Sequence, residues 1–140
     1  MKPWILYSLL SMVFAGLTAV VAKAGLKDIS SDAAVLIRTV LVLGIVLVQY
    51  LLFHRFGELG QVPGRALVWL SVSALTTALS WIFYYRAVQQ GPVSQVALID
   101  KASILVTLAL AALFLKEPFT LKTGLGAGLM LAGLLILIWK

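Results

Sequence analysis

Residues 92–115 read PVSQVALIDKASILVTLALAALFL, an apolar run with a carboxylate and an ammonium side by side at Asp100 and Lys101. The run is long enough for a helix to cross the hydrocarbon core of a bilayer, which takes about twenty apolar residues. A charge inside such a span is costly unless it is paired or hydrated, and proteins that keep one usually need it. We therefore interpret residues 92–115 as a membrane span. If the protein moves protons, Asp100 is the expected carrier.

The whole composition is that of an integral membrane protein. The chain has 140 residues, 62% of them hydrophobic and 11% charged, which does not fit a soluble globule. The net charge of +6 comes from basic residues scattered one or two per loop, without the block or stripe that indicates nucleic-acid binding. The absence of cysteine excludes disulfides and thiolate ligands, and His54 beside Arg55 is interpreted as an interfacial side chain. No metal or cofactor is predicted.

Five spans fit between the loop signals, so the sequence predicts one all-α domain over residues 1–140. The spans are residues 4–24, 33–53, 66–89, 93–115 and 121–139. The first resembles a secretory signal but is longer than a signal core. Ser31 or Asp32 is expected to cap the second span, and Thr120 the fifth. Aromatic residues expected near the interface on the side of the N-terminus are Trp4, Tyr7, Tyr50, Phe53, Trp69 and Phe119.

An odd number of spans places the two termini on opposite sides, here named side A (N-terminus) and side B (C-terminus). Side A carries Lys2, Arg55, Arg65, Lys116 and Lys122. Side B carries Lys23, Lys27, Arg86 and Lys140, with Arg38 just inside the membrane. The positive-inside rule depends on the difference in the number of basic residues between the two sides, and here that difference is close to zero. The sequence therefore predicts little orientation bias, and we expect dual topology.

Charged residues of four spans are predicted to share the side-B half of the bilayer. A helical rise of about 1.5 Å per residue places Arg38, Asp100 and Lys101 roughly 8 to 12 Å below the side-B surface. Lys23 and Arg86 are expected a few ångströms deep. One alternative is that Asp100 only neutralises Arg38 or Arg86, while Lys23 and Arg86 extend their charged groups to the lipid headgroups.

Uncharged polar residues are predicted to continue this cluster toward the midplane. Ser80, Trp81 and Tyr84 lie on the third span, with Ser80 and Tyr84 four residues apart. On the fourth span, Ser103 and Thr107 follow Asp100 at positions i+3 and i+7, which is one helix face. A water-filled substrate cavity open to side B would satisfy all of these groups.

Small residues form a second pattern, in the last span. Gly124 and Gly128 make a GxxxG motif that Ala132 extends. Such faces let helix backbones approach closely in lipid. Two alternatives stay open, namely packing within the chain and a subunit interface.

Two stretches resemble the EamA domain of the drug/metabolite transporter superfamily, in its short five-helix form. Residues 14–39, FAGLTAVVAKAGLKDISSDAAVLIRT, are similar to the opening of that domain, and residues 81–140 to its second half. Short members often carry a Pro-Val-Asp-Lys-Leu-Ser type of segment, which IDKAS at residues 99–103 resembles. One departure is Lys116, where a glycine usually precedes Glu117.

The resemblance implies transport of small metabolites or toxic compounds across a bacterial or archaeal inner membrane, usually coupled to protons. Larger relatives hold two five-helix halves of inverted topology, so an antiparallel homodimer is the implied way to complete this chain. The alternatives are a non-catalytic subunit or lipid-linked sugar flippase module, and a small multidrug exporter. The cationic surplus around Asp100 favours an anionic or zwitterionic substrate. No residue pattern indicates an enzyme.

Overall fold

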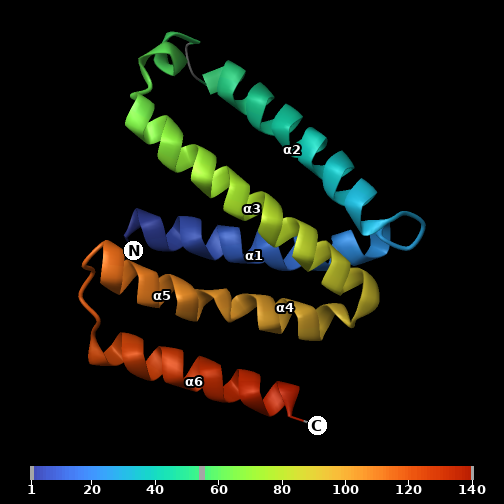
Figure 1. The fold of residues 1–140 in the computed structure, drawn as a ribbon, viewed down its shortest axis with the longest axis vertical. Coiled ribbons are helices and arrows are strands. Elements are labelled where there is room, and N and C mark those ends of the chain that lie inside the picture. The colour runs from blue at the N-terminus through green and yellow to red at the C-terminus, as the bar shows by residue number, and fades with distance from the viewer. Residues whose placement is uncertain (1, 54–55, 140) are drawn as a thin grey trace. The chain divides into compact units, whose positions relative to one another are not determined.

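The computed structural model describes residues 2–53 and 56–139; the predictions made for His54, Arg55 and Lys140 lie outside them. The described residues form helices joined by turns and loops, and they contain no strand. It divides into two compact units, Met1–Gln90 and Gly91–Lys140. Unit 1 holds α1 (Pro3–Gly25), α2 (Ser31–Phe53), the 3₁₀ helix η1 (Phe56–Gln61) and α3 (Gly64–Gln90). Unit 2 holds α4 (Val93–Lys101), α5 (Ser103–Phe114) and α6 (Leu121–Ile138) (Figure 1).

Four segments have the length and apolar composition to cross a membrane. They are Pro3–Gly25, Ser31–Phe53, Gly64–Gln90 and Val93–Phe114; the apolar part of α6, Leu121–Ile136, is shorter. A helix satisfies its own backbone hydrogen bonds, which is why apolar segments adopt this form in lipid. Most large apolar side chains are exposed, including Leu36 at 66% and Phe53 at 75%. A surface this apolar is suited to a bilayer rather than to water.

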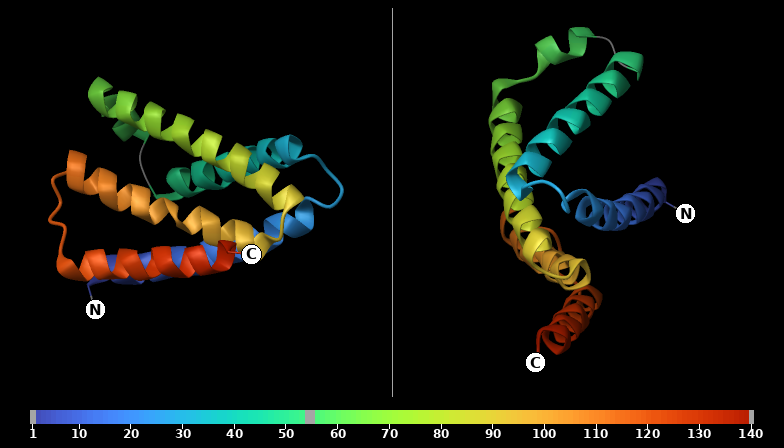
Figure 2. Two further views of the ribbon diagram at one scale, coloured as in Figure 1. Left: turned by 60° about the horizontal axis from the view of Figure 1, so that its bottom comes forward. Right: turned by 90° about the vertical axis from the view of Figure 1, so that its right-hand side faces the viewer.

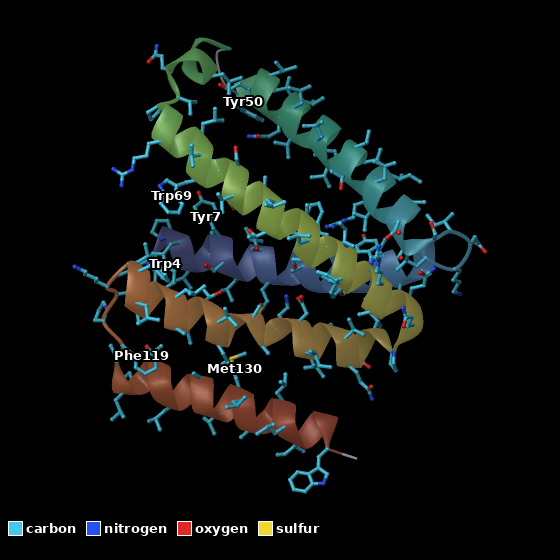
Figure 3. The ribbon with its side chains drawn as sticks, viewed as in Figure 1. Trp4, Tyr7, Tyr50, Trp69, Phe119 and Met130 are labelled. Carbon is cyan, nitrogen blue, oxygen red and sulfur yellow. The ribbon has the colours of Figure 1, made fainter. Side chains whose placement is uncertain are left out.

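The core of unit 1 lies at its side-B end. The buried residues of the described chain are Ala19, Leu26, Ser31, Ala34, Tyr85 and Val88, and all belong to the end of α1, the turn after it, the start of α2 or the end of α3. From this end α2 and α3 diverge (Figures 1 and 2). At the opposite end of unit 1 lie Trp4, Tyr7, Tyr50 and Trp69 (Figure 3), where the sequence predicts an aromatic belt.

The two helix caps predicted from sequence have different outcomes. Thr120 caps α6, since its hydroxyl accepts the Thr123 N–H at 3.2 Å. For α2 the prediction was wrong by one residue, because the Ser30 hydroxyl accepts the Ala33 N–H at 3.3 Å. Ser31, which was expected to cap, is already helical and buried. Capping by Ser30 leaves the Asp32 side chain available for a contact with α3.

The predicted fourth span is interrupted in its middle. The N–H of Ala102 donates to the carbonyl of Ile99 at 3.0 Å, and the N–H of Leu105 donates to the carbonyl of Ala102 at 2.9 Å. These bonds span three residues instead of four, so the chain tightens from α-helix to a 3₁₀ turn between α4 and α5. The expectation of one regular helix over residues 93–115 is corrected, and a 3₁₀ turn inside a helix often marks a hinge.

Lys116 has a left-handed backbone, with φ of 54°. This conformation turns the chain away from α5, and the Glu117 N–H then donates to the Ala111 carbonyl at 3.3 Å. Glycine adopts such a conformation without steric cost, whereas a residue with a Cβ loses about 1 kcal/mol or more. The departure from glycine noted in the sequence therefore places a strained residue at the end of α5.

We expect Lys116→Gly to raise the free energy of unfolding by about 0.5–1 kcal/mol, because the strain is removed. Lys116→Asn should gain less, since asparagine tolerates this conformation better than lysine but not as well as glycine. Lys116→Ala is the matched control, because it removes the same charge and keeps the Cβ. Unfolding in mixed micelles measures all three. Equal gains for glycine and alanine would assign the effect to charge.

Candidate functional site

Arg38 of α2 lies against two aromatic rings of α3. Its guanidinium carbon is 4.4 Å from the centroid of the Trp81 ring and 5.8 Å from that of Tyr85. Both contacts are within the range of cation–π attraction, about 6 Å. Tyr85 is buried at 4% exposure and also meets Tyr84 edge to face, with ring centroids 6.1 Å apart. We call Arg38, Trp81 and Tyr85 the arginine–aromatic cluster.

Two grooves flank this cluster within unit 1. The first, of about 410 Å³, lies between α2 and α3 and is lined by Trp81 together with hydroxyl residues that include Thr39 and Thr77. The second, of about 360 Å³, is lined by Arg38 and Tyr85 and by residues of α1. Volumes of this order are typical of small-molecule sites. The predicted site residues Arg38 and Trp81 are thus brought together beside space for a ligand.

Lys23 closes the C-terminal end of α3. Its ammonium donates hydrogen bonds to the carbonyls of Val88 and Gln89. The last carbonyls of a helix have no partner inside it, and a cation there also interacts favourably with the helix dipole. These hydrogen bonds do not decide whether Lys23 also reaches the depth of the headgroups. Lys23 joins α1 to the end of α3.

Arg86 forms a bidentate ion pair with Asp32. Its Nη2 lies 3.1 Å from Oδ1 and 3.2 Å from Oδ2, and its Nε lies 3.2 Å from Oδ1. The side chains are 50% and 65% exposed, so the pair contributes less than about 1 kcal/mol by itself. Arg86 was expected either to pair with Asp100 or to extend to the headgroups. Its carboxylate partner is Asp32, which the sequence analysis did not select.

Gln89 is a second residue that sequence reasoning missed. Its amide nitrogen donates to the Ile29 carbonyl at 3.2 Å, and its amide oxygen accepts the Ser31 N–H at 3.3 Å. Both bonds tie the end of α3 to the turn between α1 and α2. The only sequence signal was an amide residue at the predicted side-B end of the span. Gln89, Lys23 and the Arg86–Asp32 pair together hold the packed end of unit 1.

Asp100 and Lys101 lie at the end of α4, directly before the break at Ala102. Asp100 Oδ2 is 3.7 Å from Lys101 Nζ, and the side chains are 36% and 62% exposed respectively. Lys101 is the last residue of α4, and the helix is interrupted at the next residue, Ala102. The paired charges therefore coincide with the interruption of the fourth span.

The other polar residues predicted for the site have more local roles. Thr107 donates its hydroxyl to the Ser103 carbonyl one turn earlier, at 3.1 Å. Ser103 begins α5, so the face predicted from Asp100 through Ser103 to Thr107 crosses the break instead of running along one helix. Ser80 is exposed on α3.

A groove of about 230 Å³ separates the broken segment from α6. Leu98, Lys101 and Ala102 line it from the side of the break, and Met130 and Gly133 from α6. Figure 3 shows Met130 pointing from α6 toward α4 and α5. Lys101 thus extends beside an otherwise apolar groove, and the charged pair has room around it within unit 2.

Gly124 has a packing partner in its own unit. A Cβ built at Gly124 would lie 3.1 Å from Cε1 of Phe119, whose ring approaches the start of α6 (Figure 3). Gly128, in contrast, has nothing within 4 Å of its Cβ position. The two glycines of the GxxxG motif therefore differ, since Gly124 accommodates Phe119 and Gly128 has open space beside it.

Comparison with known proteins places these features in a family. Residues 2–139 match the EamA-like transporter family. The chain is also 40% identical over 136 residues to a protein of Sinorhizobium sp. named "Uncharacterized transporter in cobO 3'region", covering 97% of this chain and 96% of that protein. No solved structure matches this chain. With its apolar helices and near-complete family match, this multi-pass membrane protein belongs to the EamA-like transporter family.

Proposed function

We propose that the protein is a secondary transporter that moves a small metabolite or toxic compound across the cytoplasmic membrane of a bacterium or archaeon and is driven by protons. The observation that carries the proposal is Asp100, paired with Lys101 at the break in Val93–Phe114. A carboxylate inside an apolar span is the group expected to load and release a proton there. The name of the Sinorhizobium relative supports transport in general.

The break offers a way to couple proton binding at Asp100 to a change in the direction of the helix. A 3₁₀ turn can absorb a change in direction between α4 and α5, and the groove beside Lys101 leaves space for it. We propose that protonation of Asp100 weakens its pair with Lys101 and so favours a different angle at Ala102. Proton binding would then be linked to the side of the membrane on which the transporter is open.

We further propose that two copies assemble antiparallel. Inverted repeats build many transporters, with the substrate site near the repeat interface. We count the shorter α6 as a fifth span beside the four longer ones, and a second copy inserted upside down then provides the inverted half. The open faces of Gly128 and Ala132 on α6 are the proposed contact.

Gly128→Leu is expected to weaken self-association, because the larger side chain separates helices that pack through this face. Crosslinking in native membranes and in detergent measures the dimer fraction. Gly126→Leu is the matched control, since Gly126 also has open space but lies off the face. Gly124→Leu is avoided, because it would clash with Phe119. An unchanged dimer fraction in Gly128→Leu would place the interface elsewhere.

Transport by the purified full-length chain in proteoliposomes tests the proposed function. A panel of anionic, zwitterionic, cationic and neutral metabolites is offered with and without an imposed pH gradient. We expect accumulation of at least one compound that depends on the gradient. If nothing is transported, the protein is a non-catalytic subunit or a lipid-linked sugar flippase module. Transport of hydrophobic cations alone would favour a small multidrug exporter.

A further inference from the structure

The groove beside Arg38 has a chemistry of its own. We infer that it binds an anion with an apolar body, such as a medium-chain carboxylate, and that this is the substrate class. The inference rests on the proposed function, because it names what the transporter recognises. It concerns unit 1 alone, and its evidence is independent of Asp100.

Arg38 lines the groove, and its guanidinium lies over the rings of Trp81 and Tyr85. Contact with an aromatic ring engages the face of a guanidinium, whereas its N–H donors lie in the plane at its edge. Among the described residues of unit 1, Asp32 pairs with Arg86, and no carboxylate is paired with Arg38. An arginine stays charged in proteins. Its edge is thus ready for a carboxylate or a phosphate, which bind a guanidinium with two parallel hydrogen bonds.

The remaining walls of the groove select the rest of the ligand. Phe14, Leu17 and Val21 line it from α1, and they are between 56% and 69% exposed. The Thr18 hydroxyl, also in the lining, donates to the Phe14 carbonyl at 2.8 Å. That proton is therefore used within the helix, and Arg38 is the charged donor of the groove. The site fits one anionic head attached to an apolar body, and it repels an ammonium group.

This chemistry could be supplied by a soluble acid or by an anionic lipid. The Arg38 groove, of about 360 Å³, is of the size of small-molecule sites, and the first groove, which Trp81 and hydroxyl residues line, adjoins the same arginine–aromatic cluster. Two spaces of this size at one cluster suit a small ligand that moves between them more than a lipid that stays bound. We therefore commit to the soluble acid as the occupant.

The test uses the full-length protein in phosphatidylcholine nanodiscs, with radiolabelled octanoate as the probe and empty discs as background. Octanol and octylamine are the neutral and cationic competitors of equal length. We expect saturable octanoate binding that the other two do not displace. Arg38→Gln should weaken binding by about ten- to hundredfold, the effect of one charge-assisted bidentate contact. The octanoate affinity of Arg38→Lys should lie between those of Arg38→Gln and the unmodified chain, since lysine keeps the charge without the planar guanidinium.

Two further variants keep the result interpretable. Arg65→Gln removes an exposed arginine from the first turn of α3 and should bind octanoate as the unmodified chain does. Leu17→Trp fills the groove from the exposed face of α1 while keeping the charge of Arg38, and it should also abolish binding. Fluorescence of Trp81, with Trp4, Trp69 and Trp139 replaced by phenylalanine, reports whether octanoate reaches the cluster.

Three results would overturn the inference. The first is equal displacement by octanol or octylamine, and the second is unchanged binding in both Arg38→Gln and Leu17→Trp. The third is Arg38-dependent retention of phosphatidylglycerol, seen by native mass spectrometry, without octanoate binding; this would make the groove a lipid site. Transport of other compounds without octanoate binding would refute this inference and leave the proposed function intact. Arg38-dependent binding without any transport would confirm the anion site but refute the proposed function, and with it the role of the anion as substrate.

Discussion

Asp100→Asn is expected to abolish accumulation driven by a pH gradient while substrate exchange at equal pH continues. Asparagine has nearly the shape of aspartate but cannot take up or release a proton, so it removes the coupling step alone. Both activities are measured in proteoliposomes on the same preparation. Asp32→Asn is the matched control, because it removes the carboxylate of the other ion pair, which Asp32 forms with Arg86 in unit 1. It should keep gradient-driven accumulation.

A structural role for Asp100 predicts a different pattern. Asp100→Asn leaves Lys101 without its ion-pair partner, and the loss of activity could then reflect an unpaired charge. The double variant Asp100→Asn with Lys101→Gln removes both charges and should restore stability. If Asp100 carries the proton, the double variant remains uncoupled. Recovery of gradient-driven accumulation in the double variant would show that Asp100 is only a counter-ion for Lys101.

The sequence predicted the helical architecture well, because long apolar runs between charged or glycine-rich loops leave few alternatives in lipid. It did not predict the break at Ala102. Alanine is the strongest helix former, and the residues on either side continue the apolar run. The sequence places two adjacent charges, Asp100 and Lys101, directly before the break. A sequence pattern records that these charges are present, but not where the backbone hydrogen bonds change from a spacing of four residues to three.

The sequence predicted which charged residues gather at the site better than which residues contact one another there. Depth along antiparallel helices placed Arg38, Arg86 and Lys23 near side B, and the structure brings all three to the packed end of unit 1. The partner of each residue depends on how its helix is rotated about its own axis. The sequences of these apolar spans have only weak amphipathic patterns, so they do not define that rotation. Thus Asp32, expected only as a possible cap of the second span, became the partner of Arg86. Trp81 became the partner of Arg38.

A second prediction concerns the orientation of the protein in the membrane. We expect C-terminal fusions to green fluorescent protein and to alkaline phosphatase both to be active in the same strain, because basic residues are almost evenly divided between the two sides. Neutralising Lys2 and Lys122 on side A should fix the C-terminus inside the cell. Neutralising Lys27 and Lys140 on side B should fix it outside. These residues are chosen because Lys23 and Arg86 also hold the packed end of unit 1.

The two fixed variants provide a test of the antiparallel dimer that does not depend on the substrate-binding residues. Each variant expressed alone can form only parallel pairs, and we expect it to be inactive in cells even though it is stably inserted. Co-expression supplies both orientations and should restore transport to the level of the unmodified chain. The ion pair of Asp32 with Arg86 should not alter the outcome, because acidic residues contribute little to orientation. Full activity of either variant alone would exclude the antiparallel arrangement, and a parallel dimer or a partner chain would have to complete the transporter.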